Sequence, residues 1–321
     1  MRARVGDAIV LTTYGRSSGF VLDPIEKKPL AHVLPGSTIL SFGTAGCNLA
    51  CKYCQNWEIS TSRDIDTLTA PATPQALAAA ASDAGAAGVA FTYNDPVIFA
   101  EYAIDTAAAC RKAGLASVAV SAGWISPEPC TELFGAVDAA NIDLKGFTDD
   151  FYRRVTGARL TDVLDTLTRV RALGTWLEIT TLLIPGRNDS DAEIAAECAW
   201  IAAELGAEVP VHFSAFHPAH RMRETPRTPA STLERARAIA RDAGLAHVYL
   251  GNVRTRDGAS TRCAGCGTLL VDREGYRVTD YRITSEGACP QCGRRVPGLW
   301  DPAGPPPAAG QWLPRRVAVG V

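Results

Sequence analysis

Residues 37–54 read STILSFGTAGCNLACKYC, an apolar run followed by three closely spaced cysteines. The run over 37–43 predicts a short strand, and the loop after it carries Cys47, Cys51 and Cys54 at C-x3-C-x2-C spacing. Three thiolates on one loop can ligate a cluster of soft metal ions. On a four-iron cube they leave one iron open, as a chemically active site requires. Chance spacing and a zinc knuckle with a distant fourth ligand are the alternatives.

The rest of the chain alternates strand and helix patterns. Further strands are predicted over 88–93, 116–121, 137–144, 176–184, 211–216 and 246–250, and helices over 74–84, 97–113, 127–134, 160–172, 192–205 and 231–243. Such alternation predicts parallel strands joined by right-handed crossovers. About six units over roughly 215 residues favour an α/β fold with a partial (β/α)6 TIM-type barrel. A doubly wound sheet is the alternative, and either architecture places ligands at the carboxyl ends of the strands.

Composition and turn signals divide the chain into four parts. We expect an N-terminal segment over 1–36, the partial barrel over 37–252, a four-cysteine metal-binding module over 253–300 and a Pro/Ala/Gly-rich, loose tail over 301–321. The module is too small for an ordinary hydrophobic core. It therefore needs a metal ion to hold it together.

The module carries two C-x2-C-G knuckles, with Cys263 and Cys266 in one and Cys289 and Cys292 in the other. Four thiolates at this spacing predict a closed tetrahedral site in a zinc-ribbon-like module. Zinc is the expected metal, and a single iron or an iron–sulfur cluster also suits four thiolates. The arginines of this region leave a nucleic-acid-binding module as a remote alternative, weakly supported because few aromatic residues are interleaved with them.

Charge and cysteine usage narrow the class of protein further. The 32 basic and 34 acidic residues give a formal net charge of −2, so there is no general electrostatic reason to bind nucleic acid or a membrane surface. No stretch reaches 18 apolar residues, and the first residues do not look like a secretory signal. Seven of the ten cysteines fall into the two groups. In a chain of this size that favours metal binding in the cytoplasm over disulfides.

The cysteine loop resembles the signature of radical SAM enzymes, in which an aromatic residue, here Tyr53, precedes the third cysteine. Flanking motifs at 23–30, 34–37, 43–48 and 54–60 resemble the AmmeMemoRadiSam system branch of this family. That branch is similar to the enzymes that activate pyruvate formate-lyase. The resemblance covers about residues 14–300. Relatives in this branch often carry a further N-terminal cysteine-rich segment, so we expect either a short form or a start assigned too late.

The resemblance implies a [4Fe–4S] cluster on the three cysteines and S-adenosylmethionine (SAM) on the open iron. Reductive cleavage of SAM would give a 5′-deoxyadenosyl radical that abstracts a hydrogen atom from an unidentified small molecule or peptide. A reductase or a flavodoxin- or ferredoxin-type protein would supply the electron. The alternative within the family is an activase that acts on a glycyl-radical enzyme. The branch name also implies Memo-like and Ammecr-like partner proteins.

Residues at or after the strand ends resemble the family's SAM contacts. In this sequence they are Tyr53, Asn94, Asp95, Ser121, Asp143, Lys145 and His212. Asp95 stands where the family usually has Glu, so it is expected to act through water. Other interpretations stay open: Asp95 as a helix cap, Asp143 and Lys145 as a simple strand-end ion pair, and His212 as a packed core residue.

Overall fold

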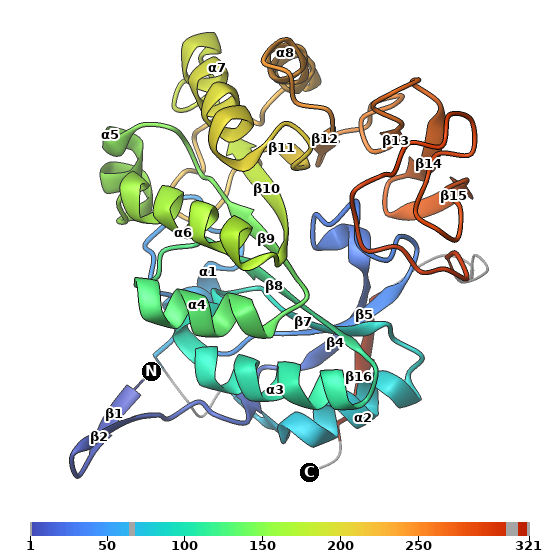
Figure 1. Cartoon of the computed structure of the whole chain (residues 1–321). Helices are drawn as coiled ribbons and strands as arrows, with labels where there is room; N and C mark the ends of the chain where they lie inside the picture. The colour runs from blue at the N-terminus through green and yellow to red at the C-terminus, as the bar shows by residue number, and fades with distance from the viewer. Residues whose placement is uncertain (1, 64–67, 306–313, 320–321) are drawn as a thin grey trace.

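Seven parallel strands make up most of a nine-stranded sheet in the computed structural model, which describes residues 2–63, 68–305 and 314–319 (Figure 1). The parallel strands are β5 (Thr38–Phe42), β7 (Gly88–Phe91), β8 (Ala116–Ser121), β9 (Ala139–Asp143), β10 (Trp176–Leu183), β11 (Val211–Ala215) and β12 (Val248–Gly251). They lie side by side in chain order. A doubly wound sheet would reverse its strand order partway, so the predicted partial barrel is confirmed.

Helices follow the parallel strands and cover one face of the curved sheet (Figure 1). They are α2 (Pro74–Asp83), α3 (Ala100–Lys112), α4 (Pro127–Ala136), α6 (Leu160–Leu173), α7 (Asp191–Trp200) and α8 (Ala230–Asp242). The Thr73 side chain accepts a hydrogen bond from the Ala76 N–H and so caps α2, and Ser190 caps α7 in the same way. Every residue of β5 and β7 is buried, as a sheet covered on both faces requires.

Shorter elements complete the fold, and two of them, 96–99 and 201–205, overlap the helices predicted over 97–113 and 192–205. They are the strands β1 (Arg2–Val5), β2 (Ala8–Leu11), β3 (Arg16–Ser17) and β6 (Ala70–Pro71), the helices α1 (Trp57–Thr61) and α5 (Asp149–Phe151), the 3-10 turns η1 (Ile25–Lys27) and η2 (Pro96–Phe99), and the π-helical segments η3 (Tyr152–Thr156) and η4 (Ile201–Leu205). No described helix is long and apolar enough to span a bilayer.

The tail departs from the expectation of a loose segment. Residues Arg315–Val317 form β16, which pairs antiparallel with β4 (Phe20–Pro24), itself antiparallel to β5. An outer strand presents unpaired backbone groups, and β16 satisfies those of β4. The tail residues 306–313 and 320–321 lie outside the described part of the chain.

The four-cysteine module has its own antiparallel sheet of β13 (Thr261–Arg262), β14 (Leu269–Glu274) and β15 (Arg277–Tyr281). A buried arginine fastens it to the N-terminal segment. Arg273 donates to the Ala31 carbonyl at 2.7 Å and to Thr261 Oγ1 at 3.0 Å, and its guanidinium lies 3.4 Å from the Glu26 carboxylate. Both members of that ion pair are almost fully buried.

Arg273→Met should destabilise the protein by about 3–5 kcal/mol, because it leaves Glu26 buried without its counter-charge. Chemical unfolding monitored by circular dichroism measures this loss. The double variant Arg273→Met with Glu26→Gln should lose less than the single variant, since the uncompensated charge is gone. Equal losses would contradict a charge-pairing role for Arg273.

Candidate cofactor and metal sites

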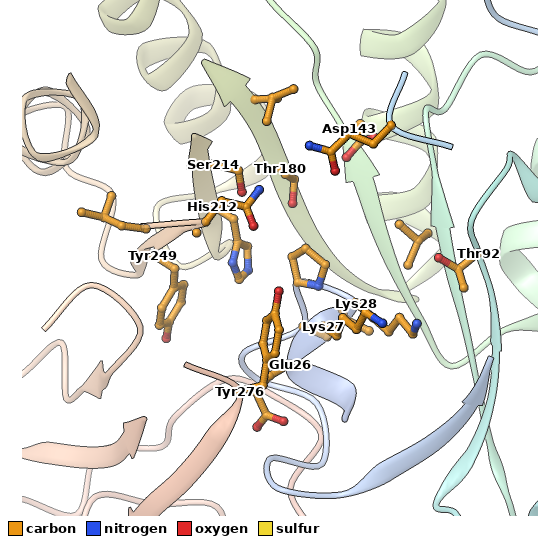
Figure 2. A pocket seen from close by; sticks show the side chains of 18 of the residues that line it. Glu26, Lys27, Lys28, Thr92, Asp143, Thr180, His212, Ser214, Tyr249 and Tyr276 are labelled. Carbon is orange, nitrogen blue, oxygen red and sulfur yellow. The ribbon is translucent and has the colours of Figure 1, made fainter. Parts of the chain in front are cut away.

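The carboxyl ends of the parallel strands open into one large cavity of about 1520 Å³, here called the central cavity (Figure 2). Its wall includes the three cysteines of the first cluster and residues at or just beyond the ends of the parallel strands. The opposite wall comes from the N-terminal segment and from the four-cysteine module, whose Tyr276 faces into it (Figure 2). The candidate residues named from the sequence all line this cavity: Cys47, Cys51, Cys54, Tyr53, Asn94, Asp95, Ser121, Asp143, Lys145 and His212.

Backbone contacts fix the shape of the cysteine loop, residues 47–54. The Ala50 and Lys52 N–H groups donate to the Thr156 and Val155 carbonyls at 2.8 and 2.9 Å. Those carbonyls belong to the last two residues of η3, and the end of a helix leaves its final carbonyl groups without a partner within the helix. The sequence reasoning missed this segment, because a π-helical turn has no pattern distinct from that of an ordinary helix.

Asn94 braces the same loop from the other side. Its amide nitrogen donates to the Gly46 carbonyl at 2.7 Å, and its amide oxygen accepts from the Thr44 N–H at 3.1 Å. Both ends of the amide are therefore used on the residues that lead into Cys47. Asn94 lies at the cavity, as the sequence predicted, but its contacts position the loop.

The cysteine thiols suit metal ligands. Burial raises the pKa of Cys47 to about 12, with Asp95 adding to the effect, and burial raises the pKa of Cys51 to about 11. A thiolate is the ligand form of cysteine, so these thiols would ionise here only with a cation such as a metal ion beside them. Three soft donors on one preformed loop, open to a cavity, fit the iron–sulfur cluster that the sequence pattern suggests.

Asp95 and Ser121 form a buried pair beside the loop. One Asp95 oxygen accepts from Ser121 Oγ at 2.8 Å and from the Val97 N–H at 3.1 Å, while the other accepts from the Ala122 N–H at 2.8 Å. Burial raises the pKa of Asp95 despite these donors. Asp95 thus caps η2 and also faces the cavity, so the helix-cap interpretation is compatible with a ligand contact.

Asp143 and Lys145 form an ion pair of 2.7 Å at the end of β9. Burial lowers the pKa of Lys145, but Asp143, Tyr53 and Cys51 outweigh it and raise that pKa well above its ordinary value. The hydroxyls of Tyr53 and Thr180 are buried in the cavity wall without a hydrogen-bond partner among the described residues. Orphaned polar atoms of this kind indicate that a polar ligand belongs beside them.

Glu178 is the functional candidate that sequence reasoning missed. Its carboxylate lies 2.6 Å from His212 Nε2 and accepts from the Ala31 and His32 N–H groups at 2.8 Å. Burial alone would raise the pKa of Glu178, yet His212 and the other donors lower it to about 2. His212 also stacks on Tyr249 with ring centroids 5.0 Å apart. The sequence did carry a sign of Glu178, because a glutamate stands inside the apolar run of β10.

The four cysteines of the module form a compact group, with their sulfurs all within 4.8 Å of one another. The Cys263–Cys292 and Cys266–Cys289 sulfur distances are 3.6 and 3.7 Å. A tetrahedral ion with bonds of about 2.3 Å places its sulfurs about 3.8 Å apart. This spacing therefore suits one tetrahedral ion. It argues against an iron–sulfur cluster, which distributes its thiolates over different irons.

Comparison with known proteins identifies relatives of the chain. The sequence model of the radical SAM superfamily matches residues 42–199. An uncharacterized protein of Methanocaldococcus jannaschii is 36% identical over 296 residues, which span 92% of this chain and 88% of that protein. A pyruvate formate-lyase-activating enzyme of Clostridium pasteurianum is 27% identical over 154 residues, 46% of this chain and 63% of that enzyme.

A solved structure also shares the fold. The radical SAM methyltransferase from Sphaerobacter thermophilus superposes with a TM-score of 0.51 at 17% identity, over 73% of this chain and 71% of the other. At that identity the likeness concerns the arrangement of strands and helices alone.

Replacing Cys289 and Cys292 with Ser should remove about one equivalent of zinc or iron per chain and lower the unfolding temperature, because the tetrahedral site loses half its ligands. Elemental analysis of the purified protein measures the metal. The control with Cys47, Cys51 and Cys54 changed to Ala should keep that equivalent. Unchanged metal content in the first variant would exclude the four-cysteine site.

Glu178→Gln should cost about 2–3 kcal/mol at pH 7, because the amide keeps only one acceptor oxygen and its NH2 group must face an N–H donor that the ionised carboxylate accepts from. The pKa of Glu178 is about 2 in the folded chain against an ordinary value of 4.5. Its stabilisation is therefore complete above about pH 4.5 and declines as the pH falls toward 2. Unfolding titrations from pH 6 to 3 should converge for the wild type and the variant. A constant difference across that range would contradict the ionised state.

Proposed function

Since this chain belongs to the radical SAM superfamily, we propose that it cleaves SAM reductively and abstracts a hydrogen atom from a small-molecule or peptide substrate. Cys47, Cys51 and Cys54 would hold a [4Fe–4S] cluster, which when bound supplies the electron that converts SAM into methionine and a 5′-deoxyadenosyl radical. The observation that carries the proposal is that these three cysteines line the same cavity as the polar strand ends.

The chain's own polar groups would bind and orient SAM. Lys145 and Asp143 offer a cation and an acceptor side by side, which complements the charged carboxylate and amino groups of the methionine part. The unpartnered Tyr53 hydroxyl lies in the same wall. Ser121 fixes the Asp95 carboxylate, and Asn94 fixes the loop before Cys47, so both act as positioning residues.

His212 would contact the adenosine part of SAM from the other side of the cavity. Glu178 holds one ring nitrogen at 2.6 Å, and Tyr249 stacks against the ring. A ring fixed from two sides loses little freedom when a ligand binds, which favours tight binding. Figure 2 shows His212 and Tyr249 near each other, with Ser214 and Thr180 between them and Asp143.

The central cavity has room for a substrate in addition to SAM. Its volume of about 1520 Å³ exceeds the roughly 300–1,000 Å³ of typical small-molecule sites. The N-terminal segment and the four-cysteine module wall off one side, which would limit the access of water to reactive species. Zinc in the module would serve this structural role.

The reaction also needs an electron donor. Members of this superfamily generally depend on a reductant, and a reductase, flavodoxin or ferredoxin of the cytoplasm is the proposed source. Memo-like and Ammecr-like partners stay a prediction from the branch resemblance.

A glycyl-radical activase is the second candidate. The similarity to the Clostridium pasteurianum activating enzyme favours it, although that match spans less than half of this chain. Co-purification of a glycyl-radical enzyme that gains a SAM-dependent glycyl radical signal would establish this version. Its absence under conditions that support SAM cleavage would favour a small-molecule or peptide substrate.

Anaerobic reconstitution with iron and sulfide, followed by dithionite and SAM, should yield 5′-deoxyadenosine, measured by chromatography. The variant with Cys47, Cys51 and Cys54 changed to Ala should yield none above background, because the open-iron site is lost. The variant with Cys289 and Cys292 changed to Ser controls for general loss of cysteine. Failure of reconstituted protein to cleave SAM with substrate and donor supplied would contradict the proposal.

A further inference from the structure

A cluster of four side chains at the central cavity has no part in the contacts described so far. Asp23 accepts from Lys27 Nζ at 2.8 Å, from Lys28 Nζ at 2.7 Å and from the Tyr93 hydroxyl at 2.7 Å. We call these residues the Asp23 cluster. Lys27, Lys28 and Tyr93 line the cavity. Figure 2 shows the two lysines on the side toward Thr92, away from His212 and Tyr249.

The cluster holds more positive than negative charge. Burial raises the pKa of Asp23, but Lys28, Lys27 and Tyr93 outweigh it and bring that pKa below its ordinary value, so Asp23 is ionised. Its single negative charge faces two ammonium groups. The Asp23 side chain is fully buried and that of Lys28 is 2% exposed, so water reaches the charges of this cluster mainly at Lys27, whose side chain is 36% exposed.

The lysine nitrogens also have unused hydrogen-bond donors. An ammonium group carries three N–H bonds. Lys28 uses one of them on Asp23 and faces the Tyr93 ring at 4.9 Å, and Lys27 likewise donates to Asp23. Among the described residues neither has another hydrogen-bond acceptor. A buried ammonium with free donors at a cavity wall is a site for an acceptor that the protein itself does not supply.

The remaining carboxylates of the cavity cannot compensate for this charge because each is already engaged. Asp143 pairs with Lys145, Glu26 with Arg273, and Asp95 with Ser121 and two backbone N–H groups. The other two carboxylates that line the cavity also have partners. Asp272 accepts from Ser260 and Thr279, and Glu274 pairs with Arg277. Exposed Arg254 and Arg256 line the cavity without an ion pair among the described residues.

The backbone at Tyr93 is held in an unfavourable conformation. Its φ of 72° lies in the left-handed region, where a residue with a large side chain is rare. Such a conformation persists when surrounding contacts over-determine it, and it concentrates at functional sites. Here it combines the hydroxyl bond to Asp23 with the ring contact to Lys28, so both depend on one strained residue.

We propose that Lys27 and Lys28 bind an anionic group of the substrate, a carboxylate or a phosphate, at the central cavity. The inference rests on the proposed function, because it concerns the substrate of the same site. Asp23 and Tyr93 would hold the two ammonium groups so that their free N–H bonds converge on the anion. Burial lowers the pKa of Lys28 to about 8, and a bound anion would raise it again by favouring the charged form.

The test is an anion titration of the reconstituted, unreduced protein by calorimetry, with inorganic phosphate and succinate as separate probes. We expect at least one probe to bind. Lys27→Gln should weaken that binding about tenfold or more, since it removes a charged donor. Its side chain is 36% exposed, so folding should be retained. Lys112→Gln on the exposed end of α3 is the matched control and should bind as the wild type does.

The same titration in the presence of saturating SAM distinguishes a substrate site from a cofactor site. Anion binding that persists with SAM present supports a substrate site, whereas competitive loss would assign the lysines to the SAM carboxylate and overturn the proposal. Failure of both probes to bind, or unchanged binding by Lys27→Gln, would also overturn it. The titration needs no SAM cleavage. Lysine-dependent anion binding without cleavage would therefore contradict the proposed function alone, and cleavage without anion binding would contradict this inference alone.

Discussion

One buried carboxylate connects the three parts of the chain that enclose the central cavity. Glu178 on β10 accepts from the backbone of Ala31 and His32 and contacts His212 on β11. An ionised carboxylate in the core is tolerable only while its donors stay in place. The N-terminal segment therefore cannot leave the barrel without a large cost. His32, fixed in this way, donates to the Pro297 carbonyl of the four-cysteine module at 2.6 Å, so the module's position also depends on Glu178.

The sequence was sufficient to predict the barrel and most cavity-lining candidates, because both follow from local pattern. Apolar strands separated by helices determine a parallel sheet, and parallel strands end at the same edge. Side chains at or just after those ends, such as Asp95 and Asp143, must then meet at one cavity. The cysteine loop after β5 follows the same logic. The partial barrel is confirmed, while the roles of the individual SAM contacts stay predictions.

What the sequence could not supply are the pairings between distant residues. Glu178 and His32 are separated by 146 positions, and Asp23 and Tyr93 by 70. No periodicity indicates such partners. The strand β16 was missed for a related reason, since an outer strand is defined by the neighbour it pairs with and a tail rich in proline gives little sign of it. These long-range contacts fix the positions of polar side chains that the sequence could only place near the strand ends.

The two groups of cysteines differ in how closely their sulfurs lie, and each spacing suits a different kind of metal site. The module brings together two knuckles separated in sequence, and its four sulfurs already stand at single-ion spacing. Among the described residues no other group of three or more His, Cys, Asp or Glu side chains is so compact. Cys47, Cys51 and Cys54 share one continuous loop bonded to η3 and do not form a group of that compactness. Thiolates that ligate different irons must stand farther apart than thiolates on one ion. The wider set therefore suits a cluster with an open position, and the compact set suits a closed structural ion.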